Sequence, residues 1–259
     1  MLVLSRVRLI TTLAHGPNIL LSRITAPSEP STMLDCSRVT IVVPIYNEGY
    51  RVPQTLQPLV ATGYTILAID DGSTDQSWEL MRVAGVTRLR HVLNRGQGAA
   101  IQTGIDYALG QGAEYIVTFD ADGQHLVSDI PALLQPLVDG RADVTLGSRF
   151  LGTTINMPRT RWLLLKAGVQ FTRFVSGIKV TDTHNGLRAF TAAAARQLTL
   201  TLDRMEHASE ILNKISLGRL RYLEVPCTIT YSQETLLKGQ SAQDALRVAL
   251  RFVASLLLR

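Results

Sequence analysis

Apolar, β-branched runs alternate with helix-like segments through the first 150 residues, and this alternation constrains the fold more than any other feature of the chain. Unbroken apolar runs are typical of strands that are buried on both faces of a sheet. Strands that alternate with helices predict a doubly wound, mostly parallel α/β sheet with right-handed crossovers and helices on both faces. Such strands are expected at residues 39–46, 64–70, 87–93, 115–120 and 142–148.

The second half of the chain is less regular. It predicts helices at 158–177, 191–198 and 208–215, and a loop beginning near residue 180 that leads into a short strand. Residues 219–231 predict two short strands on either side of Pro226, because proline interrupts the ladder of a strand.

Polar, glycine-bearing segments end nearly every strand of the predicted sheet. In sheets of this kind, ligands bind beyond the carboxyl ends of the strands. The segments that meet there would be PIYNEG, DDGSTD, NRGQG, DADGQH and GSRF. Their convergence at one edge predicts a ligand site more strongly than any one of them alone.

The segment YIVTFDADGQH places two carboxylates at the end of an apolar strand. Residues i and i+2 of an extended chain point to the same side, so the carboxylates of Asp120 and Asp122 are expected to converge, with Ala121 turned away. Paired hard oxygen ligands suit Mg²⁺ or Mn²⁺, and Gln124 could add an amide oxygen. Alone, the same residues are equally typical of a turn that ends a strand.

Two further strand ends carry weaker signals. Asp70 or Asp71 could accept hydrogen bonds from a nucleobase or ribose, although a turn with a helix cap explains DDGSTD in isolation. Residues 94–104 resemble a glycine-rich phosphate loop at a helix N-terminus, but they match neither of the common glycine patterns.

Charge and cysteine content limit the class of protein. The 259 residues carry a formal net charge of +5, with a pI of about 9.5, which suits an anionic partner such as a phosphate-bearing molecule or a membrane surface. The basic residues are scattered, which argues against a nucleic-acid partner. Cys36 and Cys227 lack metal-ligand spacing and are typical of thiols in a reducing compartment.

The two ends of the chain differ from the middle. Residues 1–37 contain the linker-like TAPSEPST and are expected to be a poorly structured extension, with Met33 as an alternative start. Residues 38–240 are expected to form the main domain.

Residues 241–259 predict an amphipathic helix whose Arg247, Arg251, Ser255 and Arg259 share one stripe. A basic stripe beside an apolar face suits a helix lying in a membrane interface, and residues 159–174 have similar character. Packing on the core or on a second subunit is the alternative. No stretch is long and apolar enough to predict a membrane span.

Taken together, TIVVPIYNEG, IDDGSTDQS, NRGQGAAIQTGIDYA and FDADGQH resemble, in order and spacing, the inverting family 2 glycosyltransferases with the GT-A fold. The similarity is strong over residues 38–150. GSRF and DTHNGLRAF are similar to the branch that contains dolichyl-phosphate mannose synthase and the bacterial polyprenyl-phosphate glycosyltransferases.

The resemblance implies roles for residues of this chain on the side of the nucleotide sugar. The metal ligands would be Asp120, Asp122 and Gln124, and the ion would be Mg²⁺ or Mn²⁺ on the diphosphate. The residues that contact the nucleotide sugar would be Pro44, Tyr46, Glu48, Ala68, Asp70, Asp71, Asp120, Ala121, Asp122, Arg149 and Lys238. Gln97 stands where the family often carries lysine, which puts one phosphate contact in doubt.

The same resemblance implies a catalytic set of Arg149, Asp182 and Arg188, with Gly186 in the acceptor-side loop. Asp182 is the candidate for a base or an orienting residue. Glu206 and Glu210 are the alternatives, although Glu210 is also typical of the wet face of a helix. A lipid phosphate is already anionic near pH 7 and needs no base, whereas a hydroxyl acceptor does.

The implied activity is inverting transfer of one sugar from a UDP- or GDP-sugar to a membrane-associated acceptor, namely a polyprenyl phosphate. Transfer to a hydroxyl of a lipid-linked or cell-surface glycan is the alternative. An inactive nucleotide-sugar-binding or membrane-scaffolding protein is the rival from another class, and the intact pair of aspartates disfavours it. The protein would be cytoplasmic and peripheral at the inner face of the membrane, with a homo-oligomer possible. The absence of a QxxRW motif argues against a processive polysaccharide synthase.

Overall fold

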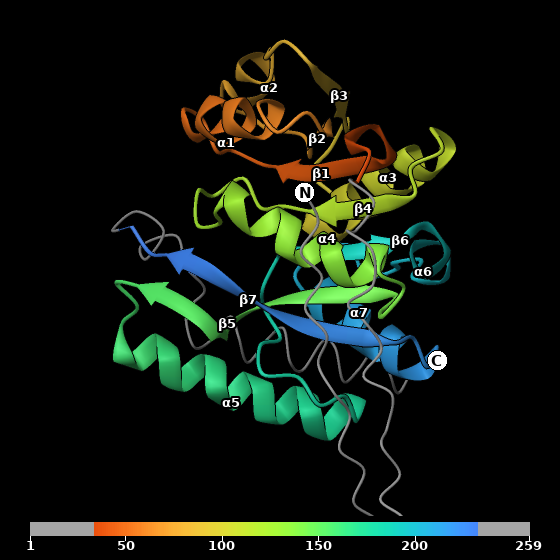
Figure 1. Ribbon diagram of the computed structural model, residues 1–259. Helices are drawn as coiled ribbons and strands as arrows, with labels where there is room; N and C mark the ends of the chain where they lie inside the picture. Colours follow the sequence, from red (N-terminus) through yellow and green to blue (C-terminus); the bar gives the residue numbers. More distant parts are fainter. Residues whose placement is uncertain (1–33, 233–259) are drawn as a thin grey trace, which may run out of the picture. The chain divides into compact units, whose positions relative to one another are not determined.

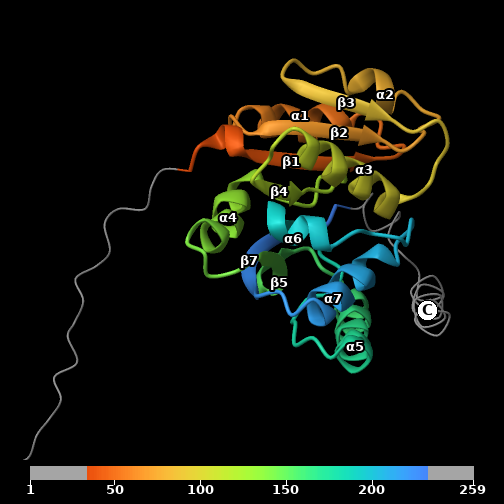
Figure 2. The same ribbon diagram turned by 90° about the vertical axis from the view of Figure 1, so that its right-hand side faces the viewer.

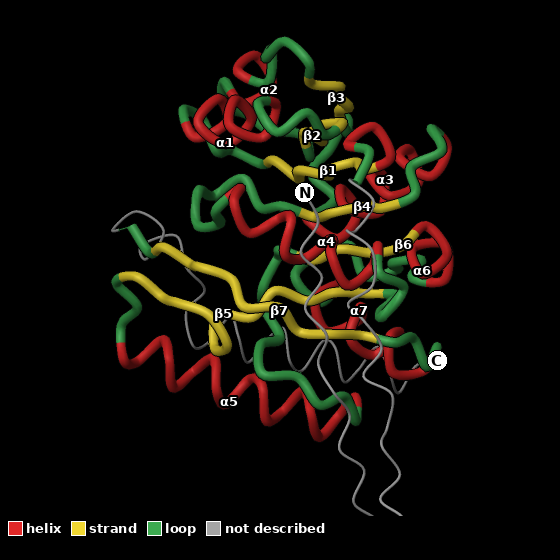
Figure 3. Tube along the Cα trace, viewed as in Figure 1, coloured by secondary structure: helices red, strands yellow, loops and turns green. Residues whose placement is uncertain are grey.

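The computed structural model describes residues 34–232, all within one unit of the chain. A seven-stranded sheet with the order β3-β2-β1-β4-β6-β5-β7 forms its centre (Figures 1 and 3). The strands are β1 (Val39–Ile45), β2 (Thr65–Asp70), β3 (Val86–Arg90), β4 (Tyr115–Thr118), β5 (Val144–Ile155), β6 (Arg188–Thr191) and β7 (Tyr222–Thr230).

The sheet is mostly parallel, as the sequence predicts. β1 pairs in parallel with both β2 and β4, β2 with β3, and β5 with β7. Only β6 runs antiparallel to its neighbours β4 and β5. Because the strand order reverses at β1, the carboxyl ends of β1, β2 and β4 meet at the edge where doubly wound sheets bind their ligands.

Helices cover both faces of the sheet, which confirms the predicted class. α1 (Arg51–Val60), α2 (Ser77–Leu80) and α4 (Ile130–Val138) lie on the face that receives Ile41 and Val43 of β1. α3 (Gln97–Gly110), α6 (Ala192–Gln197) and α7 (His207–Leu217) pack on the other face around Val42. The side chains of β1 are buried along its whole length, which explains its unbroken apolar run. α5 (Arg159–Ser176) lies beside α7 (Figure 2).

Three elements differ from the sequence-based expectation. Residues 222–230 form one strand through Pro226, because β7 is an edge strand, where a missing N–H is tolerated. β5 continues to Ile155, well beyond the predicted end at residue 148. α2 is a helix of only four residues within the helix-like segment that separates the second and third predicted strands. The remaining short turns are the 3₁₀ segments Cys36–Arg38 and Val127–Asp129.

Several sequence-based predictions concern residues outside the described range. They are the poorly structured segment up to residue 33, Lys238 and the amphipathic helix at 241–259, and the domain boundaries drawn from them remain predictions. Within residues 34–232, no helix combines the length and the apolarity needed to cross a bilayer.

Candidate active site

The end of β4 carries the paired aspartates in a tight turn. The Oδ1 of Asp122 accepts a hydrogen bond from the backbone N–H of Gln124 at 3.0 Å, and Gly123 has a φ of 76°. The buried Ala121 is tied to α1 because its carbonyl accepts from the Thr55 hydroxyl at 3.3 Å. The turn and the carboxylate pair are therefore not alternatives, since the turn is what orients the carboxylates. Gln124 contributes its backbone to this turn.

Two side chains contact Asp120, and the backbone at Gly186 approaches it closely. Gln97, the first residue of α3, donates from Nε2 to Oδ1 at 2.7 Å, and Nε2 of His125 lies 3.5 Å from Oδ2. Gly186 approaches so closely that a Cβ there would overlap the Asp120 carboxylate. Burial alone would raise the pKa of Asp120, but His125 and the charge of Arg188 outweigh it and hold the pKa below its ordinary value.

Asp122 has the opposite shift. Its pKa is raised to about 6, first by burial and then by the charge of Asp120, and Glu48 at the end of β1 adds to the increase. Three carboxylates from two strand ends therefore repel one another at this edge. A divalent cation would offset that repulsion, so the donor set fits a hard cation that also takes phosphate oxygens. Among residues 34–232, no group of three or more His, Cys, Asp or Glu side chains forms a ready-made metal cage.

The acids at the end of β2 bind the protein itself. Asp71 accepts from the backbone N–H groups of Arg95 at 3.0 Å and Gly96 at 2.6 Å, and it also contacts Asn94 and His91. Asp71 therefore shapes the loop that leads into α3 and brings Gln97 to Asp120.

Asp70 is fully buried, with Arg90 Nε 2.9 Å from its carboxylate. Pro44 and Ala68 lie within their strands, buried and paired with Ile69 and Val43 respectively, so the structure gives both a packing role. Tyr46, just after β1, is 44% exposed at the carboxyl edge. Of the predicted contact residues on and just after β1 and β2, Tyr46 and Glu48 have side chains that are not fully buried in the described structure.

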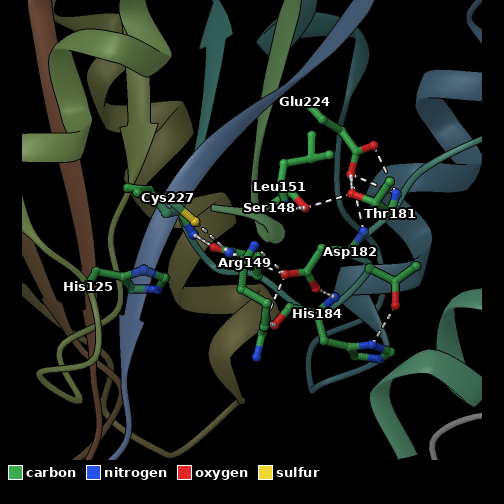
Figure 4. A network of polar contacts seen from close by, with 12 residues as sticks. His125, Ser148, Arg149, Leu151, Thr181, Asp182, His184, Glu224 and Cys227 are labelled. Atoms are coloured by element: carbon green, nitrogen blue, oxygen red, sulfur yellow. Dashed lines mark hydrogen bonds and ion pairs between the residues drawn. The ribbon is translucent and has the colours of Figure 1, made fainter. Parts of the chain in front are cut away.

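Arg149 and Asp182 form a buried ion pair at the centre of a polar network (Figure 4). Nε of Arg149 donates to Asp182 at 2.6 Å, while its two terminal nitrogens donate to the Tyr231 hydroxyl at 2.7 Å and to the His184 carbonyl at 2.6 Å. The side chains of Arg149 and Asp182 are 5% and 1% exposed. This arrangement ties β5, β7 and the loop 177–187 together, and it leaves neither side chain open to solvent.

Arg188, the first residue of β6, lies between the two acidic centres. Burial lowers its pKa to about 10, while Asp120 and Asp182 raise it, so the guanidinium stays charged at neutral pH. Nε donates to the Asn185 carbonyl at 2.9 Å and Nη2 to the Thr183 carbonyl at 3.2 Å. Nη1 is buried and has no hydrogen-bond partner among the described residues. Arg188 is thus a fixed positive charge with donor capacity beside the aspartate pair.

The two alternative bases lie at the start of α7, and both are buried. Glu210 is 2% exposed and accepts from the N–H groups of Thr201 at 3.0 Å and Leu202 at 2.8 Å. Burial would raise its pKa, but these hydrogen bonds outweigh burial and lower it. The expectation that Glu210 lies on the wet face of a helix is therefore wrong, because its carboxylate holds the loop before α7. Glu206 is 6% exposed.

The sequence analysis did not assign a role in the site to four residues that lie in or near it. Gln97 is a departure from the family pattern and His125 is the last residue of FDADGQH, yet both contact Asp120. His207, whose pKa is lowered to about 4 mainly by burial, and Glu224, on β7, come from segments without a sequence signal. Their placement depends on which strands become neighbours.

Solved structures with a similar fold indicate the class of protein. Glucosyl-3-phosphoglycerate synthase from Mycobacterium tuberculosis, solved with Mn²⁺, UDP-glucose and phosphoglyceric acid, aligns with a TM-score of 0.63 at 16% identity over 85% of this chain and 78% of that one. A mannosyl-3-phosphoglycerate synthase from Rubrobacter xylanophilus aligns with a TM-score of 0.61 over 85% of this chain and 73% of the other, at 15% identity. The fold is that of the GT-A glycosyltransferases.

The sequence comparisons narrow this class to a family. The model for Glycosyl transferase family 2 matches residues 40–199. A UDP-N-acetylglucosamine–dolichyl-phosphate N-acetylglucosaminyltransferase of Methanococcus voltae is 30% identical over 83% of this chain and 94% of the relative. A polyprenol monophosphomannose synthase of Mycolicibacterium smegmatis is 32% identical over 68% of this chain and 70% of the relative. The chain belongs to glycosyl transferase family 2 and is a glycosyltransferase.

Proposed function

We propose that this enzyme transfers one sugar, with inversion, from a nucleoside-diphosphate sugar to a polyprenyl phosphate. The observation that carries the proposal is the convergence of the aspartate pair with a charged arginine. Asp120 and Asp122 lie just after β4, and Arg188 at the start of β6 is paired with Thr118, the last residue of β4. The names of the relatives, which include enzymes of dolichyl and polyprenol phosphates, support a lipid phosphate as the acceptor.

Asp120 and Asp122, with Gln124 as a further ligand, would hold a Mg²⁺ or Mn²⁺ ion. Such an ion, when bound, supplies positive charge to the diphosphate of the donor. Arg188 would add a second positive charge, directed at phosphate oxygens through its buried Nη1. Charge placed where the leaving diphosphate becomes more negative stabilises the transition state more than the ground state.

The remaining residues would position the two substrates. Tyr46 and Glu48 would face the nucleotide of a UDP- or GDP-sugar from the end of β1. Asp182 would orient Arg149 and the acceptor-side loop, because its carboxylate is buried and paired. A lipid phosphate attacks as an anion, so a buried, paired Asp182 is compatible with this acceptor.

The proposal is tested by incubating the full chain with Mn²⁺ and a panel of UDP- and GDP-sugars, first in thermal shift and then in transfer assays. We expect one nucleotide series to raise the melting temperature only when Mn²⁺ is present. We also expect sugar transfer to a short-chain polyprenyl phosphate and not to the corresponding polyprenol. Transfer to a glycan hydroxyl alone would contradict the lipid-phosphate acceptor, and stabilisation by nucleotide sugar without any transfer would support an inactive binding protein.

We also propose that the protein works at the inner face of the membrane, and α5 supports this. Trp162, Leu163 and Phe174 of α5 are 43%, 62% and 91% exposed. Basic residues accompany them, and no acidic residue occurs between Phe150 and Thr181. Next to the start of the helix, a pocket of about 370 Å³ is lined by Thr154, Met157, Arg159, Trp162 and Leu163. An exposed apolar surface with positive charge suits the boundary between anionic headgroups and acyl chains.

Replacing Leu163 and Phe174 with glutamine is expected to weaken binding to vesicles that contain anionic lipid by about tenfold or more. Each fully buried apolar side chain contributes about 1.5–3 kcal/mol, which exceeds the 1.4 kcal/mol of a tenfold change. Vesicle co-sedimentation of the full chain measures the effect. Leu217→Gln is the matched control, because Leu217 on α7 is 75% exposed and lies outside α5. An equal loss in the control would contradict the proposal for α5.

A further inference from the structure

The loop between α5 and β6, residues 177–187, joins the two halves of the site. At one end Asp182 pairs with Arg149, and at the other Gly186 packs against Asp120. The Gly186 carbonyl also accepts from the Thr118 hydroxyl at 2.6 Å, so the loop is fixed to the end of β4. The two parts of the loop are therefore fixed separately, Asp182 by Arg149 of β5 and Gly186 by Thr118 of β4.

Glu224 of β7 holds this loop through its backbone. Its carboxylate accepts from the Thr181 N–H at 2.7 and 2.8 Å, from the Thr181 hydroxyl at 2.8 Å, and from the Asp182 N–H at 3.1 Å (Figure 4). Two consecutive backbone donors and a hydroxyl thus converge on one carboxylate. Hydrogen bonds to an ionised acceptor are shorter and about twice as strong as neutral ones.

Thr181 also connects β7 to β5, because its hydroxyl contacts both Glu224 and Ser148. The Thr181 hydroxyl lies 2.6 Å from the Ser148 hydroxyl, and Ser148 directly precedes Arg149 on β5. β5 and β7 are paired, with Leu146 opposite Glu224. Glu224 therefore lies close to the strand segment that carries Arg149, and it fixes the backbone N–H of Asp182 while Arg149 fixes the Asp182 side chain.

We infer that Glu224 is a positioning residue for the acceptor side of the reaction: its carboxylate sets the backbone of Thr181 and Asp182 so that the Asp182 carboxylate keeps Arg149 in place. The inference rests on the proposed function for the identity of the acceptor. Among the described residues, the Glu224 carboxylate contacts the loop at Thr181 and Asp182, whereas the Gly186 end is fixed separately by the Thr118 hydroxyl. We therefore expect the donor side, built on Asp120, Asp122 and α3, to change little when Glu224 is replaced. A misplacement of about 1 Å far from the reacting atoms can cost about 100-fold in rate.

The test compares Glu224→Ala and Glu224→Gln with the unaltered full chain. For Glu224→Ala we expect kcat/KM for a short-chain polyprenyl phosphate to fall by about 10- to 100-fold, while the Kd of the nucleotide sugar with Mn²⁺ changes by less than about twofold. Glu224→Gln keeps one acceptor oxygen and should recover part of the loss. Asp143→Asn is the matched control, because Asp143 pairs with Arg221 at the exposed start of β7 and does not contact the loop.

A second measurement does not depend on activity. Hydrogen exchange of peptides covering 178–187 should be about tenfold faster or more in both Glu224 variants and unchanged in the control. Unchanged exchange, or a donor Kd that weakens in step with the acceptor parameters, would overturn the inference. If the unaltered chain transfers no sugar to polyprenyl phosphate, the proposed function fails, and the exchange measurement still decides whether Glu224 holds the loop. If Glu224→Ala does not fold, Glu224→Gln carries the same comparison.

Discussion

Replacing Asp122 with asparagine is expected to reduce sugar transfer by about 1,000-fold and to remove the stabilisation of the protein by Mn²⁺. The substituted side chain would keep the shape of the turn, since its amide oxygen can still accept from the Gln124 N–H. It would lack the charge that binds a divalent cation, and a loss of about 4 kcal/mol of transition-state stabilisation corresponds to this decrease. Transfer assays and thermal shift with and without Mn²⁺ measure the two effects.

The pH dependence of stability distinguishes a metal-binding role of Asp122 from a purely structural role. The pKa of Asp122 is about 6 in the folded chain against an ordinary value of 3.8, so between these values the folded chain binds more protons than the unfolded chain. The free energy of unfolding therefore falls as the pH rises from about 4 to 6, by on the order of 2–3 kcal/mol from this group. Asp122→Asn should remove that decrease and be more stable than the unaltered protein above pH 6.

Stabilisation by Mn²⁺ should follow the opposite trend in the unaltered protein. Protons and the cation compete for Asp122, so the Mn²⁺-dependent rise in melting temperature should grow as the pH increases through 6. Asp106→Asn is the control, because Asp106 is exposed on α3. Within the described structure, its side chain accepts a hydrogen bond from Gln102 and lies outside the aspartate turn. Undiminished Mn²⁺ stabilisation in Asp122→Asn would refute the metal assignment.

The sequence predicts the position of a site residue when local backbone pattern is enough to determine that position. Asp120 and Asp122 are predicted to lie together after a buried strand because the strand, the i, i+2 spacing and the glycine are all local features, and both residues do follow β4. The same reasoning could not place Asp71, whose carboxylate turns toward the backbone of Arg95 and Gly96, more than 20 residues away. A strand-end acid that binds a ligand and one that binds a loop have the same local sequence, and only the neighbouring chain distinguishes them.

Partners from distant segments explain the other differences. The resemblance implies that Arg149 and Asp182 belong to one catalytic set, but it does not predict their pairing. Their burial follows from β7 and the residue after it, which bring Glu224 and Tyr231 against them. The short strand β6 is predicted from the sequence, but its antiparallel direction depends on β4 and β5, which become its neighbours only in the folded chain. Glu210 has an exposed helix spacing in the sequence, yet it is buried because the loop at Thr201 supplies donors.

Replacing Arg149 with methionine is expected to destabilise the protein by about 3–5 kcal/mol, because it leaves the Asp182 carboxylate buried without its partner. For a domain of this size, that corresponds to a fall in melting temperature of roughly 10 °C. Asp182→Asn should cost a similar amount, since the guanidinium would then lack its counter-charge. Denaturant unfolding of both variants and of the double variant measures the effect, and we expect the double variant to lose at least about 1 kcal/mol less than the sum.

The exposed pair Arg221–Asp143 gives the matched comparison, with side chains 60% and 28% exposed. Arg221→Met should change stability by about 1 kcal/mol or less, because solvent screens an exposed pair.

The stability and activity of Asp182→Asn together decide whether Asp182 is a positioning residue or a general base. A positioning residue inside a buried pair must lose stability and activity together when it is replaced. A general base must be reachable by the acceptor, so Asp182→Asn would then abolish transfer with little change in stability, and that result would return Asp182 to the role of base and exclude the buried pair as the functional arrangement.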